Sequence, residues 1–280
     1  MGSISRGWAL ARQSWYVLKS DPSLIIFPIL STVFAMIATV AIWVPVVVIR
    51  GLFTGGQVEQ NDPVYYVAGV VTAYVATFIA IFFNVALAAC TVRAMQGEDT
   101  TVGQGIGAAM RRLGPIIGWS LVTTTVGLLL RALEERLPLA GRIAAWLVGA
   151  AWAIATFFVI PIVALEDGGP VHSLKRSAAI VKERWGEGAT GAATISIVTF
   201  VVGFVVLAIG AGGAVAMVSL GQSALAVVIG ALAVAAVIVV SMMSTALSQI
   251  FRVAVYQYAV TGRTPDGFDG QMLQAAFSRH

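Results

Sequence analysis

Polar side chains that could bind a solute or a lipid headgroup recur near the C-terminus at helical spacing. Ser241, Thr245, Ser248, Arg252 and Tyr256 follow one another at i, i+4, i+7, i+11 and i+15, so a helix places them on one face. One interpretation is a cavity lining in which Arg252 holds an anionic headgroup or solute through charge-assisted hydrogen bonds. The other is that the hydroxyls bond back to their own helix while Arg252 lies at the level of the lipid phosphates.

A second polar face is predicted earlier in the chain. Thr77, Asn84 and Thr91 recur every seven residues, with Ala80 and Ala88 beside them. Such a face could line a pathway through the membrane. It is also typical of ordinary packing between helices, with Asn84 supplying a hydrogen bond, and we favour this second interpretation.

Other kinds of chemistry have little support in the sequence. There is no Walker loop, HExxH or GxSxG motif, which are signatures of nucleotide binding, zinc hydrolysis and serine hydrolysis. The single cysteine, Cys90, excludes an intrachain disulfide and a cysteine metal cluster. We therefore expect no catalytic residue, no metal and no cofactor.

The composition is that of an integral membrane protein. Of 280 residues, 59% are hydrophobic and 11% are charged, and the mean hydropathy is +0.91, whereas soluble domains contain about 25% charged residues. The apolar runs lack the alternation of a β-barrel, so we expect an all-α fold. The net charge of +4 comes from loops and helix ends, which predicts contact with anionic lipid and no nucleic-acid partner.

Six runs are long enough to cross a bilayer, which takes about 20 residues. We expect these spans at residues 24–49, 64–92, 115–133, 142–165, 188–219 and 224–260. The link from Leu220 to Ser223 is short, so spans five and six should form an antiparallel hairpin. The sixth run exceeds the bilayer thickness, so its end should extend beyond the membrane.

The N-terminal segment, residues 3–19, is predicted to be an amphipathic helix on the membrane surface. One face is apolar and carries two tryptophans, and basic side chains flank that face. The apolar residues are Ile4, Trp8, Ala11, Trp15 and Leu18, and the flanking ones are Arg12 and Lys19. Packing of this face on the protein's own spans is an equally good interpretation.

Two further segments show the same pattern before later pairs of spans. The first lies within the loop 93–114. We expect it to be the weakest because each interior glycine costs about 1 kcal/mol in a helix, and this segment has Gly103, Gly105, Gly107 and Gly114. The second starts at Pro170 and stops at Gly186. Its apolar stripe is Val171, Leu174, Ala178, Val181 and Trp185, flanked by Lys175 and Lys182.

Basic residues predict the orientation. Of the 17 Lys and Arg residues, only Arg50, Arg131, Arg136 and Arg142 fall on the side opposite the termini, which makes both termini cytoplasmic. The chain then consists of one membrane domain, 1–280. Within it we expect three units, each an amphipathic helix followed by two spans, at 3–92, 101–165 and 171–260, before a short cytoplasmic tail, 261–280.

Two motifs resemble a known family. PIVALEDGGPVHSLKRSAAIVKERWGE, from Pro161 to Glu187, and YAVTGRTPDGFD, from Tyr258 to Asp269, are similar to a bacterial family of six-span membrane proteins of unknown function. The layout also resembles the membrane portion of glycerophosphodiester phosphodiesterases. The resemblance implies a fold and a location in the bacterial inner membrane, and no catalytic residues.

Two functions fit these observations. The first is a non-enzymatic membrane protein that binds anionic lipids, organises the membrane or acts as an adaptor, and that self-associates through faces of small residues. The alternative is a passive channel or transporter for a small solute or lipid, which uses the polar faces described above. The absence of acidic residues and histidine from the middle of every span argues against a proton-driven carrier.

Overall fold

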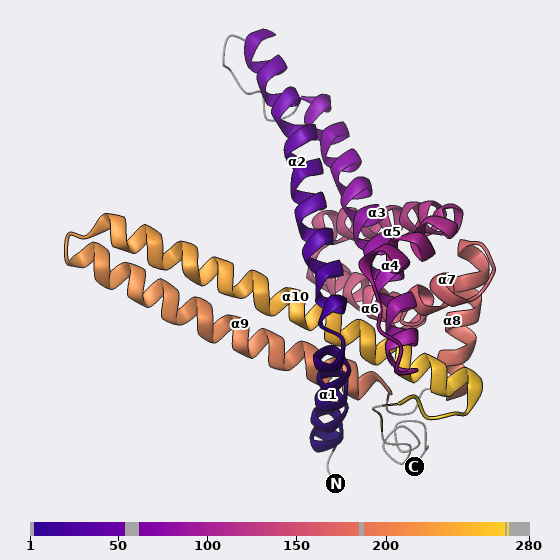
Figure 1. Ribbon diagram of the computed structural model, residues 1–280. Helices are drawn as coiled ribbons and strands as arrows, with labels where there is room; N and C mark the ends of the chain where they lie inside the picture. The colour runs from indigo at the N-terminus through magenta and orange to yellow at the C-terminus, as the bar shows by residue number, and fades with distance from the viewer. Residues whose placement is uncertain (1–2, 54–61, 185–187, 267, 269–280) are drawn as a thin grey trace. The chain divides into compact units, whose positions relative to one another are not determined.

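The computed structural model describes residues 3–53, 62–184, 188–266 and 268, and this part of the chain is all-α (Figure 1). Six helical segments within it are long and apolar enough to cross a membrane: Pro22–Leu52, Pro63–Ala94, Leu113–Arg136, Gly141–Leu165, Thr199–Ser219 and Ser223–Thr261. The predictions of an all-α fold and of six apolar span-length segments are therefore confirmed.

The chain divides into two compact units. Unit 1 comprises Met1–Ile25, Thr91–Asp99 and Arg184–His280, and unit 2 comprises Ile26–Cys90 and Thr100–Glu183. These bounds differ from those of the three helix-plus-two-spans units expected from the sequence. The three-unit organisation of a single membrane domain stays a prediction.

Unit 1 is built on an antiparallel hairpin of α9 (Gly188–Ser219) and α10 (Ser223–Thr261), which are joined by a short turn (Figure 1). The turn uses Gly221 at φ 74°, a conformation that glycine adopts without steric cost. The hydroxyls of Thr199 and Ser244 form a 2.6 Å hydrogen bond between the two helices. Helix α1 (Ser3–Ser20) and the 3₁₀ helix η1 (Pro22–Ile25) pack on this hairpin.

Helix α10 has two parts with different surroundings. Large apolar side chains are exposed from Leu225 to Val239, whereas most side chains from Ala246 to Ala259 are buried. The first part, residues 223–245, has a length of about 34 Å at 1.5 Å per residue, which is close to the thickness of the hydrocarbon core. The residues of α10 beyond this length, from Ala246 to Ala259, are thus those whose side chains are mostly buried in the protein.

Unit 2 contains α2 (Ile26–Phe53), most of α3 (Pro63–Ala94), α4 (Val102–Arg111), α5 (Leu113–Arg136), α6 (Leu139–Ala155), α7 (Val159–Leu165) and α8 (Pro170–Arg184). Ring pairs join neighbouring spans: Phe34 with Phe83, Trp43 with Tyr65 and Trp119 with Trp152.

Helix α3 begins with an Asp-Pro cap. Asp62 accepts a 3.0 Å hydrogen bond from the Val64 N–H and pairs with Arg50 from the end of α2, and Pro63 provides the first helical residue. The Val64 bond, followed by the Arg50 charge, lowers the pKa of Asp62 from its ordinary value of 3.8. A proline at the first helical position costs no hydrogen bond, since that N–H has no partner in the helix.

The fourth predicted span is interrupted. Helix α6 ends at Ala155 and α7 starts at Val159, with residues 156–158 in a turn. Pro161 explains the break, because it cannot donate a hydrogen bond to the Phe157 carbonyl and its ring would clash with that carbonyl in a continuous helix. The fourth predicted span, 142–165, is found as the candidate span Gly141–Leu165, and the turn within it was not predicted.

Helix α4 has stabilising contacts that its glycine content did not predict. Thr101 and Gln104 form a capping box at its start, which satisfies two backbone N–H groups. A Cβ on Gly105 would lie 2.4 Å from Phe27 Cζ and 2.9 Å from Cys90 Sγ, so only glycine allows this close contact. The helix propensity lost at Gly105 is thus offset by close packing.

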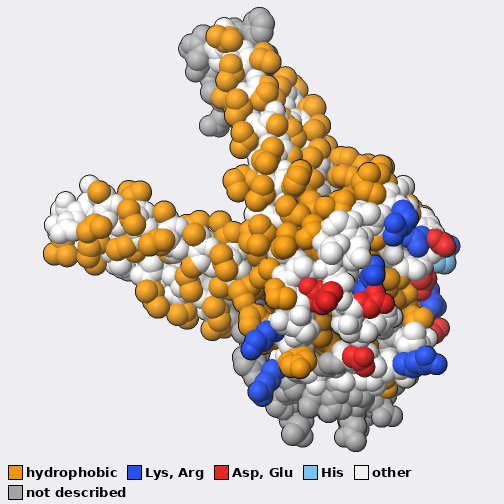
Figure 2. Space-filling model, viewed as in Figure 1, with side chains coloured by type: hydrophobic (Ala, Val, Ile, Leu, Met, Phe, Trp, Pro, Cys, Tyr) orange, Lys and Arg blue, Asp and Glu red, His pale blue; other side chains and the backbone are white. Residues whose placement is uncertain are grey.

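Hydrophobic and charged side chains are segregated on the surface. Figure 2 shows hydrophobic side chains along the α9–α10 hairpin and along the helices α2 and α3, and charged side chains lie away from them on the visible face. The same separation is expected of membrane spans, because a charged group in hydrocarbon is costly.

Candidate membrane-surface site

Helix α8 is attached at its start to α5. It follows a turn made of two acidic residues, two glycines and Pro170, and this proline is its first residue. A Cβ on Gly118 of α5 would lie only 2.6 Å from Pro170 Cγ. The missing side chain at Gly118 therefore provides the space in which α8 begins.

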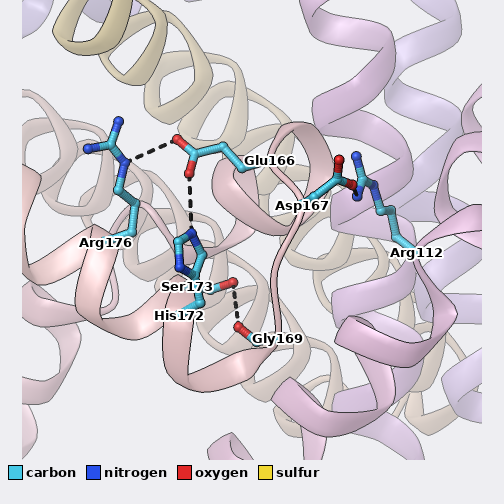
Figure 3. A network of polar contacts seen from close by, with 7 residues as sticks. All are labelled: Arg112, Glu166, Asp167, Gly169, His172, Ser173 and Arg176. Atoms are coloured by element: carbon cyan, nitrogen blue, oxygen red, sulfur yellow. Dashed lines mark hydrogen bonds and ion pairs between the residues drawn. The ribbon is translucent and has the colours of Figure 1, made fainter.

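Two acidic residues orient this turn and the first turns of α8 (Figure 3). Glu166 accepts a hydrogen bond from Arg176 Nε at 3.2 Å and lies 3.7 Å from His172 Nε2. Asp167 pairs with Arg112 at the junction of α4 and α5. Such partly exposed pairs each contribute at most about 1 kcal/mol, so their main effect is on the direction and rotation of α8.

A buried serine face attaches the middle of α8. Ser173, Ser177 and Ile180 are buried, and the Phe158 N–H donates a 3.1 Å hydrogen bond to Ser177 Oγ. This N–H belongs to the turn between α6 and α7, where a buried N–H without a partner would cost about 1–3 kcal/mol. Ser177 thus joins the surface helix to the interrupted span.

The apolar stripe of α8 lies beside the serine face and remains accessible. Leu174, Ala178 and Val181 are half-exposed and Val171 is 63% exposed. Lys175 and Lys182 are exposed on the far edge of these aliphatic side chains. An aliphatic strip bounded by lysines is the arrangement with which a helix lies at a membrane surface, because the lysine stems reach along the apolar face.

The sequence did not predict which face of α8 packs on the protein. Packing on the bundle uses the serine face, which lies about 100° around α8 from the centre of the apolar stripe, since successive residues turn by 100°. The stripe is therefore left half-exposed. Trp185, the fifth residue of the predicted stripe, lies outside the described residues.

Helix α1 has the same offset. Ser14, Val17 and Leu18 are buried, whereas Trp15 is 44% exposed and Arg12 and Lys19 are exposed. Its partners in unit 1 are α9 and α10. The side chain of Trp8 lies outside the described part. One face of α1 thus packs on α9 and α10, and the Trp15 side remains accessible. The position of α1 on the membrane surface stays a prediction.

Helix α4 repeats the offset with smaller residues. Gly105 and Ala109 are buried at i and i+4, and Met110 on the neighbouring face is 53% exposed. In all three helices a small residue stands at the centre of the packed face: Ser14, Gly105 and Ser173.

The polar residues predicted on α10 divide between two surroundings. Ser241 and Thr245 are exposed in the part with exposed apolar residues, and Thr245 Oγ1 donates a 2.9 Å hydrogen bond to the Ser241 carbonyl. Ser248 and Arg252 are half-buried, and Tyr256 is buried. The five residues follow one face of the helix, as predicted, but they do not share one environment.

Asn84 is also bonded within its own helix. Its Nδ2 donates to the Ala80 carbonyl at 2.8 Å, and the side chain is half-buried in α3. An amide bonded in this way needs no solute to satisfy its donor. The role of Asn84 as a pathway lining stays a prediction.

Sequence reasoning missed the residues that attach α8. Ser173 and Ser177 both stand in the segment SLKRS, whose four-residue spacing places them on one face. Their burial was not evident, because serine is mostly exposed in proteins. Among the described residues, no group of three or more His, Cys, Asp or Glu side chains could hold a metal ion.

The comparison with known families covers this whole region. Residues 63–268 match a family of unknown function, DUF6159. The chain belongs to this family. The DUF6159 match includes α4, the acidic turn and α8, and it ends at Phe268 after the last helix. The resemblance to a family of unknown function is thereby confirmed.

No curated protein and no solved structure shows significant similarity to the chain. The DUF6159 match begins at the first residue of α3, so α1 and α2 lie outside it. Of the three surface helices, α4 and α8 are thus part of the family pattern.

Proposed function

We propose that this protein is a non-enzymatic integral membrane protein that binds anionic lipid at the membrane surface, through α8 with α4 and α1 in support. In this proposal it organises the surrounding lipid or acts as a membrane adaptor, and it self-associates through its small-residue faces. Its location is a bacterial inner membrane with both termini in the cytoplasm, as the distribution of basic loops favours. The likeness in layout to glycerophosphodiester phosphodiesterases stays a prediction.

One observation carries the proposal, namely the division of α8 into three faces. The serine face is buried, and Ser177 accepts the Phe158 N–H. The aliphatic face is half-exposed, and Lys175 and Lys182 are exposed beyond it. A helix whose apolar face served only for packing on the protein would bury Val171 and Leu174, and here they remain accessible.

The expected affinity of α8 for anionic lipid follows from its two exposed lysines. A lysine close to an anionic surface contributes about 1 kcal/mol, so Lys175 and Lys182 together contribute about 2 kcal/mol, roughly 30-fold in affinity. The half-exposed aliphatic residues add an apolar contribution that does not depend on lipid charge. Removal of both lysines should therefore weaken binding of anionic lipid and leave binding of zwitterionic lipid nearly unchanged.

Native mass spectrometry of the full-length protein tests this proposal. The protein in detergent is titrated with phosphatidylglycerol and with phosphatidylcholine, as wild type and as the double variant Lys175→Gln/Lys182→Gln. The double variant should lose about 30-fold of its affinity for phosphatidylglycerol. Its control is Arg136→Gln/Arg142→Gln, which removes the same charge from exposed residues at the turn between α5 and α6. An equal loss in both double variants would contradict a specific role of α8.

The second candidate function is a passive channel or transporter, favoured by the polar residues aligned along α10. The hydrogen bonds of Thr245 and Asn84 to their own helices weaken it, since these groups have partners without a solute. Single cysteines at Ser241, Thr245 and Ser248, in a Cys90→Ser background, distinguish the two functions. We expect protection from a membrane-impermeant thiol reagent from either side, while Glu183→Cys is labelled. Labelling at all three positions would favour the channel.

A further inference from the structure

An open pocket on the surface of unit 1, called the cavity below, lies beside the last turn of α10. Its volume is about 520 Å³, and its polar lining residues are Gln96, Gln257, Thr261, Arg263, Thr264 and Asp266. Small-molecule sites have volumes of about 300–1,000 Å³. The cavity is therefore large enough for a small solute, and no residue of the proposed lipid-binding helices lines it.

One wall of the cavity is fixed by the end of α10. The helix ends at Gly262, with φ 68°, whose N–H donates to the Tyr258 carbonyl. Thr261 Oγ1 then accepts a 3.2 Å hydrogen bond from the Arg263 N–H. Pro265 and Phe268 are buried. The Gly262 cap, the Thr261 bond and the burial of Pro265 hold residues 263–266 in place, so Arg263, Thr264 and Asp266 form a defined wall.

The facing wall comes from the turn after α3. The Met95 and Gln96 N–H groups donate to the carbonyls of Thr91 and Arg93 at 3.0 and 2.9 Å. An ion pair between Arg93 and Glu98, with a 2.8 Å separation, closes this turn. The two walls are thus built from segments far apart in sequence, each held by its own hydrogen bonds.

The charged groups of the lining, Arg263 and Asp266, have opposite signs. The guanidinium of Arg263 and the carboxylate of Asp266 form no hydrogen bond or ion pair with each other or with any other described residue. A guanidinium binds carboxylates and phosphates, and a carboxylate binds an ammonium group. The C-terminal end of α10 also favours a cation, because its last carbonyls form the negative end of the helix dipole.

We propose that this cavity binds a small zwitterionic solute that carries an anionic group and a primary ammonium group. Arg263 binds the anionic group and Asp266 binds the ammonium, while the amides of Gln96 and Gln257 and the Thr264 hydroxyl orient the molecule. The balanced charge of the lining disfavours ligands with one charge only. The proposal stands independently of the proposed lipid binding by α8.

Two sources could supply this chemistry, a dissolved solute or a phospholipid headgroup, and the structure favours the solute. The part of α10 in which most side chains are accessible ends near Thr245, and the cavity lies beside Thr261. Sixteen residues of helix separate them, about 24 Å at 1.5 Å per residue. A headgroup at the membrane surface would not reach the cavity along this helix.

Isothermal titration of the full-length protein in detergent tests the proposal. The probes are phosphoethanolamine and γ-aminobutyrate, with inorganic phosphate and ethanolamine as single-charge counterparts. At least one zwitterion should bind, and its single-charge counterparts should bind about tenfold more weakly or less. The variants Arg263→Gln and Asp266→Asn should each weaken the zwitterion about tenfold, whereas Lys182→Gln should not change it. Thermal unfolding verifies that each variant is folded.

Two results would overturn the proposal. The first is that neither zwitterion binds up to about 10 mM, and the second is that neither variant changes the binding. Repeating the titration in nanodiscs separates the two sources. Equal affinity in phosphatidylcholine and phosphatidylethanolamine discs supports a dissolved solute. A loss of affinity only in phosphatidylethanolamine discs would show that its headgroup competes for the cavity and would overturn the assignment to a dissolved solute.

Discussion

At the scale of single residues, the account depends on polar groups that are satisfied away from water. Ser177 is fully buried and accepts the Phe158 N–H, and Asp62 accepts the Val64 N–H at the start of α3. Both bonds occur where a helix begins or is interrupted. Each therefore determines how a span connects to its neighbour in the chain.

Replacement of Ser177 by alanine should destabilise the protein. The Phe158 N–H would lose its acceptor while it remains buried, at a cost of about 1–3 kcal/mol. Unfolding of the purified protein by a denaturing detergent measures the change. Ser173→Ala is the matched control, because Ser173 is also buried on α8 but its hydroxyl donates only to the Gly169 carbonyl within the same turn. An equal loss of stability in the two variants would mean that the hydrogen bond to Phe158 contributes no more than the one to Gly169.

Asp62 predicts a dependence of stability on pH. Because the folded pKa of Asp62 is lowered from 3.8, its ionised form stabilises the folded state above that pH. This contribution is lost as the pH falls through the lower folded value. The difference in melting temperature between wild type and Asp62→Asn should therefore be larger at neutral pH than in acid below 3.8. A difference that grows on acidification would contradict the assignment.

At the scale of elements, close contacts at glycine decide which helices can pack. Gly105 and Gly103 lie two residues apart on α4, yet a Cβ would meet Phe27 and Cys90 at Gly105 and nothing within 4 Å at Gly103. If helix propensity alone decided, alanine would stabilise the protein at both positions. The packing predicts that alanine destabilises it at Gly105 and does not at Gly103.

Alanine at the two positions tests this contrast. Gly105→Ala should destabilise the protein, because Phe27 is fully buried and has little room to move, and overpacking costs about 1–3 kcal/mol. Gly103→Ala should be neutral or stabilise by up to about 1 kcal/mol, since alanine favours helix. The same detergent unfolding assay measures both. Stabilisation by both changes would show that the contact at Gly105 is loose.

The elements also show what sequence can and cannot predict here. The six apolar runs were found because their length and composition follow directly from bilayer thickness. The interruption at residues 156–158 was missed although Pro161 was visible, because a proline can also kink a helix without ending it. The face by which α8 packs on the protein was not predicted, because serine is mostly exposed in proteins, and here Ser173 and Ser177 are buried on that face.

The candidate sites were predicted less well than the fold. The helical spacing from Ser241 to Tyr256 was read correctly, yet only the structure shows that Thr245 bonds to its own helix and that Tyr256 is buried. The cavity beside Arg263 depends on Gln96 and Gln257, which are far apart in sequence. No local pattern indicates that the end of α3 and the end of α10 meet.

At the scale of the whole molecule, the features separate by environment. Large apolar side chains are exposed along α2, the first half of α3, α9 and the first part of α10, where lipid would cover them. The exposed lysines of α8 lie outside the candidate spans. The central claim is that α8 lies at the membrane surface with its aliphatic face toward the lipid and its serine face toward the protein.

Lipid quenching of a fluorophore on α8 tests this claim most directly. Single cysteines at Val171 and at Glu183, in a Cys90→Ser background, are labelled in the full-length protein and placed in nanodiscs with brominated lipid. Val171 borders the aliphatic face, and Glu183 is exposed on the other side of the helix. The account predicts strong quenching at Val171, which increases when phosphatidylglycerol is added, and little quenching at Glu183. Equal quenching at both positions, or none at Val171, would contradict it.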